Sequence, residues 1–418
     1  MRIQEYFPDG TPISDWFYDT AIPSLDELGM PYVLTEHGIA DDGKVYTADI
    51  QALIDTAAAN GGGVIVVPAG TYKTGALFFK QGVQLYIHAG GVLMGSDDIS
   101  DYPVCETRIE GESCLYYPAL INVDGVDGFV MCGEGTVDGN GLRSWKAFWQ
   151  RRQWNPACTN KDEQRPRLVY LSNCRDALVA GLTLQNSPFW SNHLYRCERV
   201  KYINCRILAP AAPVPAPSTD ALDVDVCTDI LVKGCYMAVN DDAVALKGGK
   251  GPWADIAPEN GGNERIIIED CEYGHCHSCL TCGSESIHNR NVLVRRIRIS
   301  HAAALLWLKM RPDTPQHYEY VTVDGAEGSV NSFLLIHPWT QFFDLKGRED
   351  MPLSKADHIT LKNCNCECRT YFDAEAAPQQ YQLSDFVLEN LDIRAENTAF
   401  DETVIDRLTL RNVSVVEL

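Results

Sequence analysis

Basic residues are scarce in this chain of 418 residues. Lys and Arg total 35 against 57 Asp and Glu, which gives a formal net charge of −22 at pH 7. Proteins that bind nucleic acid need a basic surface, so this balance argues against a nucleic-acid partner. The sequence also has no apolar run that approaches 18 residues, so we expect no membrane span and no membrane partner. The sequence leaves the oligomeric state open.

The first ten residues lack the apolar stretch of a secretory signal peptide. The chain also has 16 cysteines, which an exported protein would normally pair and a cytosolic protein keeps reduced. We therefore expect a cytoplasmic protein. The alternative is a periplasmic or secreted protein from which a signal peptide has been removed.

Helical periodicity is nearly absent. One segment has apolar residues at i, i+3, i+4, i+7 and i+8, which predicts a helix over residues 48–59. A short apolar strand at 64–67 and a turn at 68–70 follow it. The apolar positions of the predicted helix are Ile50, Leu53, Ile54, Ala57 and Ala58.

The second half of the chain instead repeats a strand pattern. Each unit is an alternating apolar segment, a small or polar residue, and then a Cys or aliphatic anchor, as in Ile230-Leu231-Val232-Lys233-Gly234-Cys235. Successive anchors are 22 to 38 residues apart, and 22 residues suffice for three short strands with their turns. The anchors are Leu182, Cys205, Cys235, Cys271, Ile297, Ala326, Cys364, Leu391 and Val413.

This pattern predicts an all-β solenoid, specifically a right-handed parallel β-helix. The competing solenoid is a leucine-rich repeat, whose repeat lengths are more regular and in which Leu dominates. We expect residues 1–46 to form an N-terminal extension packed on the solenoid. Residues 47–418 should form a single β-helix domain, with the helix at 48–59 capping its open end.

The segment Gly274 to Gly283 contains a cluster of Cys and His residues that resembles a metal-binding motif. However, it falls where a strand is expected, so Cys276 and Cys279 should point to opposite faces and could not share a metal ion. Four of the nine anchors are also Cys, which favours an interior ladder of small buried side chains. We therefore expect no metal and no cofactor.

Three carboxylates and one imidazole fall in the same phase of the repeat. Asp241 and Asp242 follow the anchor Cys235 by six and seven residues, and His277 follows Cys271 by six. Asp220 precedes Asp242 by 22 residues, the minimal coil length. These side chains should converge on neighbouring coils, provided that the chain bends beside Asp241. Crowded carboxylates raise one pKa, which suits general acid–base catalysis.

A second candidate is the segment 143–167, which has seven basic and two acidic residues with interleaved tryptophans. Such a segment can bind an acidic ligand with flat apolar faces. The alternative interpretation is a solvated loop with packing tryptophans.

The motifs resemble those of glycoside hydrolase family 28, the polygalacturonases and rhamnogalacturonases that hydrolyse pectin. The resemblance covers roughly residues 40 to 415. It rests on Ser218-Thr219-Asp220, Asp241-Asp242, Cys276-His277-Ser278, Trp307-Leu308-Lys309 and the stretch Asn186 to His193.

The resemblance implies inverting hydrolysis of galacturonic-acid-containing pectic oligosaccharides. Asp241 would be the general acid, Asp220 and Asp242 would hold and deprotonate the water, and His277 would tune the acid. An inverting site predicts carboxyl groups about 6.5–9.5 Å apart. The expected substrate-binding residues are Lys309, Lys247, Arg311, His193 and Trp190.

The chain departs from the family pattern where Trp307 replaces an arginine and where Cys276 and Ser278 replace glycines. These changes suggest a substrate other than plain polygalacturonate, such as an oligosaccharide from rhamnogalacturonan. Insertions at 249–263 and 331–352 favour exo-action, because they could close one end of a groove. The alternatives are a calcium-dependent β-helix pectate lyase and a non-catalytic carbohydrate-binding solenoid.

Overall fold

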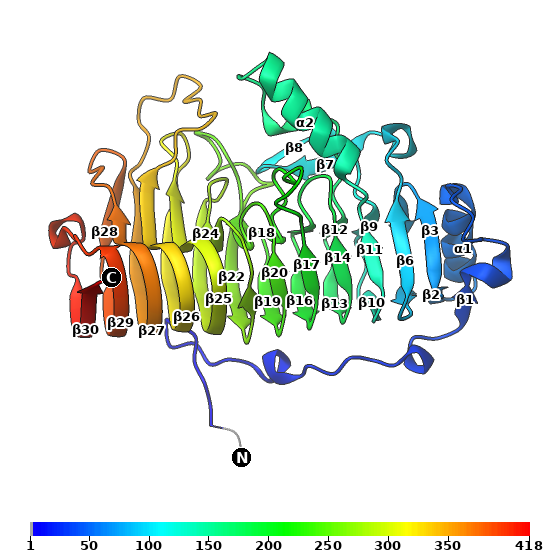
Figure 1. Ribbon diagram of the computed structural model, residues 1–418, viewed down its shortest axis with the longest axis horizontal. Coiled ribbons are helices and arrows are strands. Elements are labelled where there is room, and N and C mark those ends of the chain that lie inside the picture. The colour runs from blue at the N-terminus through cyan, green and yellow to red at the C-terminus, as the bar shows by residue number, and fades with distance from the viewer. Residues whose placement is uncertain (1–2) are drawn as a thin grey trace.

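The computed structural model describes residues 3–418 as an elongated stack of coils (Figure 1). Twenty-eight strands belong to one continuous sheet, and the pairs between successive coils are parallel. The chain is therefore a parallel β-helix, which confirms the fold class predicted from the repeat.

Three ladders of strands form the sides of the solenoid. The first contains β1 (Pro31–Val33), β2 (Gly63–Val67), β5 (Val83–Ile87), β10 (Val130–Gly133), β13 (Arg175–Ala180), β16 (Glu198–Ile203), β19 (Thr228–Lys233) and β22 (Gly262–Glu269). The second contains β3 (Gly70–Thr74), β6 (Gly91–Gly95), β11 (Thr136–Asp138), β14 (Thr183–Gln185), β17 (Arg206–Leu208), β20 (Tyr236–Ala238) and β23 (Glu272–Tyr273). The third contains β4 (Leu77–Phe79), β9 (Ile121–Asp124), β12 (Val169–Ser172), β15 (Asn192–Tyr195), β18 (Leu222–Asp225), β21 (Val244–Lys247) and β24 (Ser278–Cys282).

In the last coils the separate strands merge into long, bent ones. They pair in the order β25, β26, β27, β29 and β30, and β28 adds a short pairing with β27. Their bounds are β25 (His288–Met310), β26 (His317–Pro338), β27 (Ser354–Ala374), β28 (Tyr381–Ser384), β29 (Val387–Asn397) and β30 (Thr409–Glu417).

The predicted anchors stack in register, with Ile297 opposite Ala326 and Cys364 opposite Leu391. The residue before each anchor has a positive φ, which explains why the repeat requires a small or polar residue there. In the last coils that residue is Asn, and the side chains form a ladder of amide hydrogen bonds, between Asn412 and Asn390 at 3.0 Å and between Asn390 and Asn363 at 3.1 Å. The corner between the first two ladders is thus encoded locally.

Buried cysteines line the interior, and all sixteen are unpaired in the described chain. Cys276, Cys279 and Cys282 belong to the same interior cluster, so the prediction that Cys276 and Cys279 face opposite sides is wrong. The chain bends around Cys276 before β24 begins at Ser278, so strand alternation does not apply to it. Within residues 3–418, the groups that could hold a metal ion include no cysteine.

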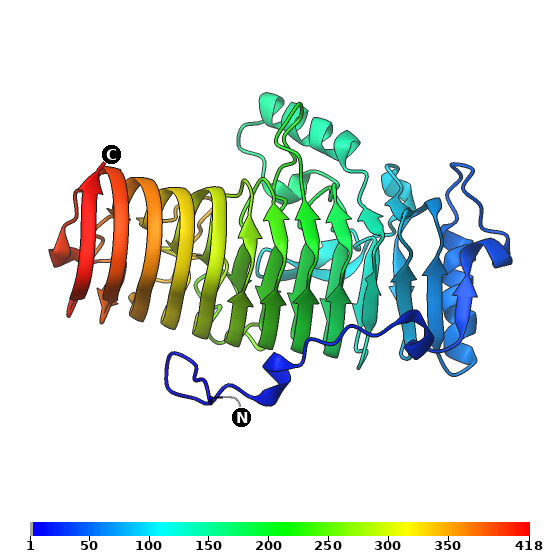
Figure 2. The ribbon, with the colours of Figure 1, turned by 60° about the horizontal axis from the view of Figure 1, so that its bottom comes forward.

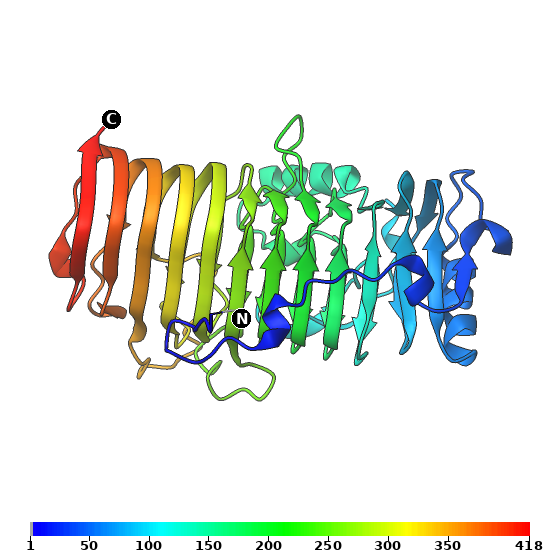
Figure 3. The same cartoon turned by 90° about the horizontal axis from the view of Figure 1, so that it is seen from below.

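The N-terminal segment runs along the outside of the first ladder (Figures 2 and 3). Phe7, Ile13 and Phe17 pack in one apolar cluster with side chains from β2 to β25, among them Leu293. The segment then supplies β1 to the sheet, and α1 (Thr47–Ala59) covers the N-terminal end of the core. It also contains three short 3-10 helices, Asp15–Tyr18, Leu25–Glu27 and Leu34–His37.

Two elements project over the third ladder and were not predicted from the sequence. The first is the antiparallel hairpin of β7 (Cys105–Ile109) and β8 (Glu112–Tyr116). The second is α2 (Leu142–Trp154), which lies above the coils in Figure 1 and forms from the basic, tryptophan-rich segment.

Neither helix of the described chain is long and apolar enough to cross a membrane. The remaining 3-10 helices are Ile99–Asp101, Asn160–Asp162 and Glu402–Val404.

Candidate active site

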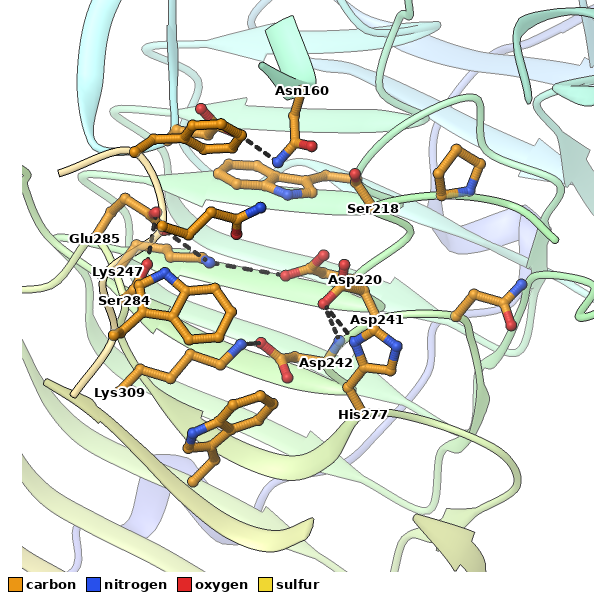
Figure 4. A pocket seen from close by; sticks show the side chains of 18 of the residues that line it. Asn160, Ser218, Asp220, Asp241, Asp242, Lys247, His277, Ser284, Glu285 and Lys309 are labelled. Atoms are coloured by element: carbon orange, nitrogen blue, oxygen red, sulfur yellow. Dashed lines mark hydrogen bonds and ion pairs between the residues drawn. The ribbon is translucent and has the colours of Figure 1, made fainter. Parts of the chain in front are cut away.

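A cavity of about 450 Å³ lies over the third ladder, between α2 and the loops of the later coils (Figure 4). Asp220, Asp241, Asp242 and His277 all line it. The cavity therefore brings together the four catalytic residues expected from the repeat phase.

Register explains this convergence. Leu222 pairs with Val244 and Val244 with Leu280, so Asp220 stands beside Asp242 and Asp241 beside His277. The chain bends at Asn240 and Asp241, between β20 and β21, which lets adjacent aspartates serve one site. One oxygen from each of Asp220, Asp241 and Asp242 lies within 4.8 Å of the other two.

Each carboxylate in the cluster has a different partner. Asp241 Oδ1 lies 3.2 Å from Nδ1 of His277 and accepts a hydrogen bond from the backbone N–H of Asp242 at 3.0 Å. Asp242 accepts from Ser278 Oγ at 3.0 Å and from Lys309 Nζ at 2.7 Å. Because the three environments differ, the carboxyl groups are chemically distinct.

The pKa values follow from these surroundings. Burial, followed by the charge of Asp241, raises the pKa of Asp220 to about 8. Burial also acts to raise the pKa of Asp241, but the charge and hydrogen bond of His277 outweigh it and hold that pKa at about 2. Burial lowers the pKa of His277, whereas Asp241 overrides it and raises this pKa to about 9. Near neutral pH, Asp220 thus holds a proton and the Asp241–His277 pair holds another.

Two lysines place positive charge against the cluster. Lys309 contacts Asp242 and lies over the rings of Trp307 and Trp339, at 4.1 and 4.9 Å from their centroids. Lys247 lies 3.8 Å from Asp220 and 3.6 Å from Asp223, and its Nζ is 5.0 Å from the centroid of Trp190. Both lysines line the cavity, as the sequence suggested.

Arg311 and Trp190 also line the cavity, whereas His193 does not. Arg311 donates two hydrogen bonds to Asp313, at 2.7 and 2.9 Å, so its charge is already neutralised. His193 is completely buried between Arg167, at 2.6 Å, and Asp225, at 3.3 Å. This corrects the prediction that His193 binds substrate, because the β7–β8 hairpin and its Arg108 cover that part of the sheet.

Sequence reasoning missed several residues of the site. Glu285 lines the cavity 3.3 Å from Lys247, and Trp339 comes from the loop after β26. Asp223 is a completely buried carboxyl group behind Asp220, and neither of its oxygens has a hydrogen-bond partner in the described chain. Asp223 follows Asp220 by three residues and Glu285 follows the Gly283-Ser284 turn, so motif context alone could have identified them.

The family model of glycosyl hydrolases family 28 matches residues 66–308. This range covers more than half of the chain and includes the whole carboxylate cluster. The chain therefore belongs to glycosyl hydrolases family 28.

Curated relatives are similar over about half of this chain. A probable polygalacturonase of Vitis vinifera is 30% identical over 226 residues, which are 52% of this chain and 44% of that protein. An exopolygalacturonase of Zea mays is 25% identical over 52% of this chain and 49% of that protein. The chain thus spans about half the length of the curated relatives it matches.

Solved structures share the fold over nearly the whole chain. An exopolygalacturonase from Thermotoga maritima has a TM-score of 0.76 at 20% identity, covering 95% of this chain and 92% of that one. A family 28 exopolygalacturonase from Yersinia enterocolitica has a TM-score of 0.69 at 16% identity, covering 93% and 79%. At these identities the likeness shows the shared β-helix.

Proposed function

We propose that this protein hydrolyses galacturonic-acid-containing pectic oligosaccharides and removes the sugar at a chain end. The observation that carries the proposal is the cluster of Asp220, Asp241 and Asp242 with His277 and Lys309 in one cavity. Relatives named as polygalacturonases and exopolygalacturonases support the substrate class.

The composition of the cavity wall supports an acidic sugar as ligand. Lys247 and Lys309 supply positive charge, and the rings of Trp190, Trp307 and Trp339 offer flat apolar faces. The indole N–H of Trp307 is buried and has no hydrogen-bond partner in the described chain. Trp307 thus replaces the charged clamp of the family with a flat, neutral side chain on the cavity wall, which supports a mixed, rhamnogalacturonan-type oligosaccharide.

The surrounding loops support action at a chain end. Trp149 of α2 donates to the carbonyl of Pro215 at 2.7 Å, which joins α2 to the proline-rich loop along one side of the cavity. On the other side, Gly251 donates to Thr314 at 3.0 Å, and Arg311 donates to the carbonyl of Phe342 at 3.1 Å. The first predicted insertion and the loop 339–353 therefore both pack at this side of the cavity.

In the proposed reaction, the Asp241–His277 pair supplies the proton. The proton moves from Nδ1 of His277 to Oδ1 of Asp241, 3.2 Å away, and from Asp241 to the glycosidic oxygen as the bond to the anomeric carbon breaks. The pair is left as a neutral imidazole and a carboxylate. Its raised proton affinity keeps it loaded at neutral pH, since the pKa of His277 is about 9.

Asp242 is the proposed base. When Lys309 turns to the substrate carboxylate, Asp242 is released to accept a proton from the attacking water, whose oxygen bonds to the anomeric carbon. Protonated Asp220 holds that water by a hydrogen bond. The closest oxygens of the three carboxylates are within 4.8 Å, shorter than the 6.5–9.5 Å expected between the carboxyl groups of inverting enzymes. Inversion therefore rests on the family resemblance alone.

The three aspartates also favour a second candidate, a calcium-dependent lyase, because clustered carboxylate oxygens are the ligands that Ca²⁺ prefers. Product analysis on defined oligogalacturonides and rhamnogalacturonan oligosaccharides separates the two reactions. A hydrolase releases saturated galacturonate from one end, whereas a lyase releases unsaturated products that absorb in the ultraviolet. Saturated products from wild type that are absent with Asp241→Asn support the proposal, and unsaturated products refute it.

We also propose that the protein works in a reducing compartment. Unpaired cysteines stack in the interior, where Cys174, Cys197, Cys205 and Cys227 are all buried. The test is a thiol titration of protein that is purified from its native source and then unfolded. Sixteen free thiols are expected, and disulfide-bonded pairs would contradict the proposed reducing compartment.

A further inference from the structure

Glu285 lines the cavity beside the turn of the β7–β8 hairpin. Its Oε1 accepts a hydrogen bond from Ser284 Oγ at 2.7 Å, and its Oε2 lies 3.3 Å from Lys247 Nζ. Arg311 Nη1 is 3.9 Å from the same carboxylate. Lys247 joins Glu285 to the catalytic cluster, because Asp220 is 3.8 Å from its Nζ on the other side.

The cavity has no room between Glu285 and the hairpin turn. The hairpin turn packs so tightly that a Cβ on Gly111 would come within 2.9 Å of the Glu285 Cβ and of the Gly249 carbonyl carbon. Gly111 also has a φ of +74°, so a residue with a side chain would be strained there. A saccharide entering from the catalytic cluster therefore ends at Glu285 and cannot continue beneath the hairpin.

The chemistry of Glu285 does not suit the carboxylate of a uronic acid. Burial acts to raise the pKa of Glu285, but Lys247 and Arg311 outweigh it and lower this pKa, so the side chain is ionised. An ionised carboxylate only accepts hydrogen bonds and repels a second carboxylate. Its natural partners are sugar hydroxyl groups, which donate.

A free hydroxyl at the position of chain linkage exists only on a terminal sugar. Within a chain linked through O4, the internal O4 is an ether oxygen and has no proton to donate. We propose that Glu285 is a specificity-determining residue that selects the non-reducing chain end by accepting hydrogen bonds from the terminal sugar, its free 4-hydroxyl above all. This inference rests on the proposed function and adds that Glu285 recognises the terminal sugar.

A binding experiment tests the inference without turnover. The Asp241→Asn variant is titrated calorimetrically with trigalacturonate and with the same trimer whose terminal sugar is 4,5-unsaturated and lacks the 4-hydroxyl. We expect the intact trimer to bind about 30-fold more tightly, as suits hydrogen bonds to a charged group. Adding Glu285→Gln should reduce that ratio to about 3-fold, since the amide keeps the shape and loses the charge.

Two controls separate the possible outcomes. Glu112→Gln changes a glutamate of the same hairpin that does not line the cavity, and it should keep the 30-fold ratio. A trimer reduced at its other end should bind like the intact one. Equal affinity for the two trimers, a ratio unchanged by Glu285→Gln, or no binding of either trimer would overturn the inference. The proposed function is tested separately by product analysis. If it is wrong, the wild-type protein releases no saturated products.

Discussion

Lys309 Nζ lies 2.7 Å from Oδ2 of Asp242, and the two side chains are 7% and 1% exposed. This contact holds the proposed base in an ion pair with the proposed substrate-binding cation. A substrate carboxylate that draws Lys309 away from Asp242 would couple the binding of an acidic sugar to release of the base.

Lys309→Met tests this coupling. Loss of a charge-assisted contact should raise KM for oligogalacturonide about 10- to 100-fold, and kcat should change less, because Asp242 is then already free of the ion pair. Steady-state kinetics with galacturonate release as readout measures both. Lys362→Met, at a partly exposed ion pair on a later coil, should leave both constants within about 2-fold. An unchanged KM in Lys309→Met would show that Lys309 does not bind the substrate.

Asp241→Asn should lower kcat by about 10²-fold or more on natural oligosaccharides, because the leaving oxygen then lacks its proton donor. On an aryl galacturonide with an acidic phenol as leaving group, the loss should shrink to less than about 10-fold, since that bond breaks without help. Asp220 also holds a proton, so Asp220→Asn is the matched comparison. If Asp220→Asn is rescued by the aryl leaving group and Asp241→Asn is not, the roles are reversed.

The pH profile should have its basic limb between about 8 and 9. Asp220, with a pKa of about 8, and His277, with a pKa of about 9, both work protonated in the proposed reaction, so kcat/KM falls as the pH rises through these values. In His277→Asn, Asp241 loses the largest influence that lowers its pKa, so its pKa rises from about 2. Asp241 must then hold the proton alone, and the limb should move to lower pH.

Removal of divalent cations should leave activity unchanged. The proposed hydrolysis assigns every step to side chains, whereas a lyase of this fold would need calcium at the three aspartates. Turnover is measured after dialysis against a chelator and after Ca²⁺ is restored. Activity that disappears and returns with calcium would support the lyase instead.

The stereochemistry can be read directly by proton NMR of the first product formed. Inverting hydrolysis of an α-linked substrate should give the β-anomer first, followed by slow mutarotation. Initial release of the α-anomer would indicate retention, which suits closely spaced carboxyl groups in which one acts as nucleophile.

The repeat and the catalytic cluster could be predicted because both are encoded by spacing. A residue with a positive φ precedes the anchor of each coil, so counting from anchors such as Cys235 and Cys271 predicts that Asp241 lies beside His277. Stacking of identical coils turns a distance in sequence into a position in space.

The covering elements could not be predicted in the same way. The apolar pattern of α2 is masked by its four basic residues, because the helix buries only Trp145 and Phe148. His193 lies at an outward-facing position of its strand, but the β7–β8 hairpin, from a distant part of the chain, covers it. Closure of the cavity thus depends on contacts between residues far apart in sequence, which local periodicity does not record.

The N-terminal segment changes how such a stack should unfold. In a simple solenoid each coil interacts only with its neighbours, so stability adds up locally and the end coils can fray. Here Asp9 pairs with Arg290 and Glu5 with Arg295, while Phe7 and Phe17 share an apolar cluster with β2 to β25. The N-terminal segment therefore contacts coils that are more than two hundred residues apart. We expect these contacts to make the coils unfold together as one cooperative unit rather than one after another.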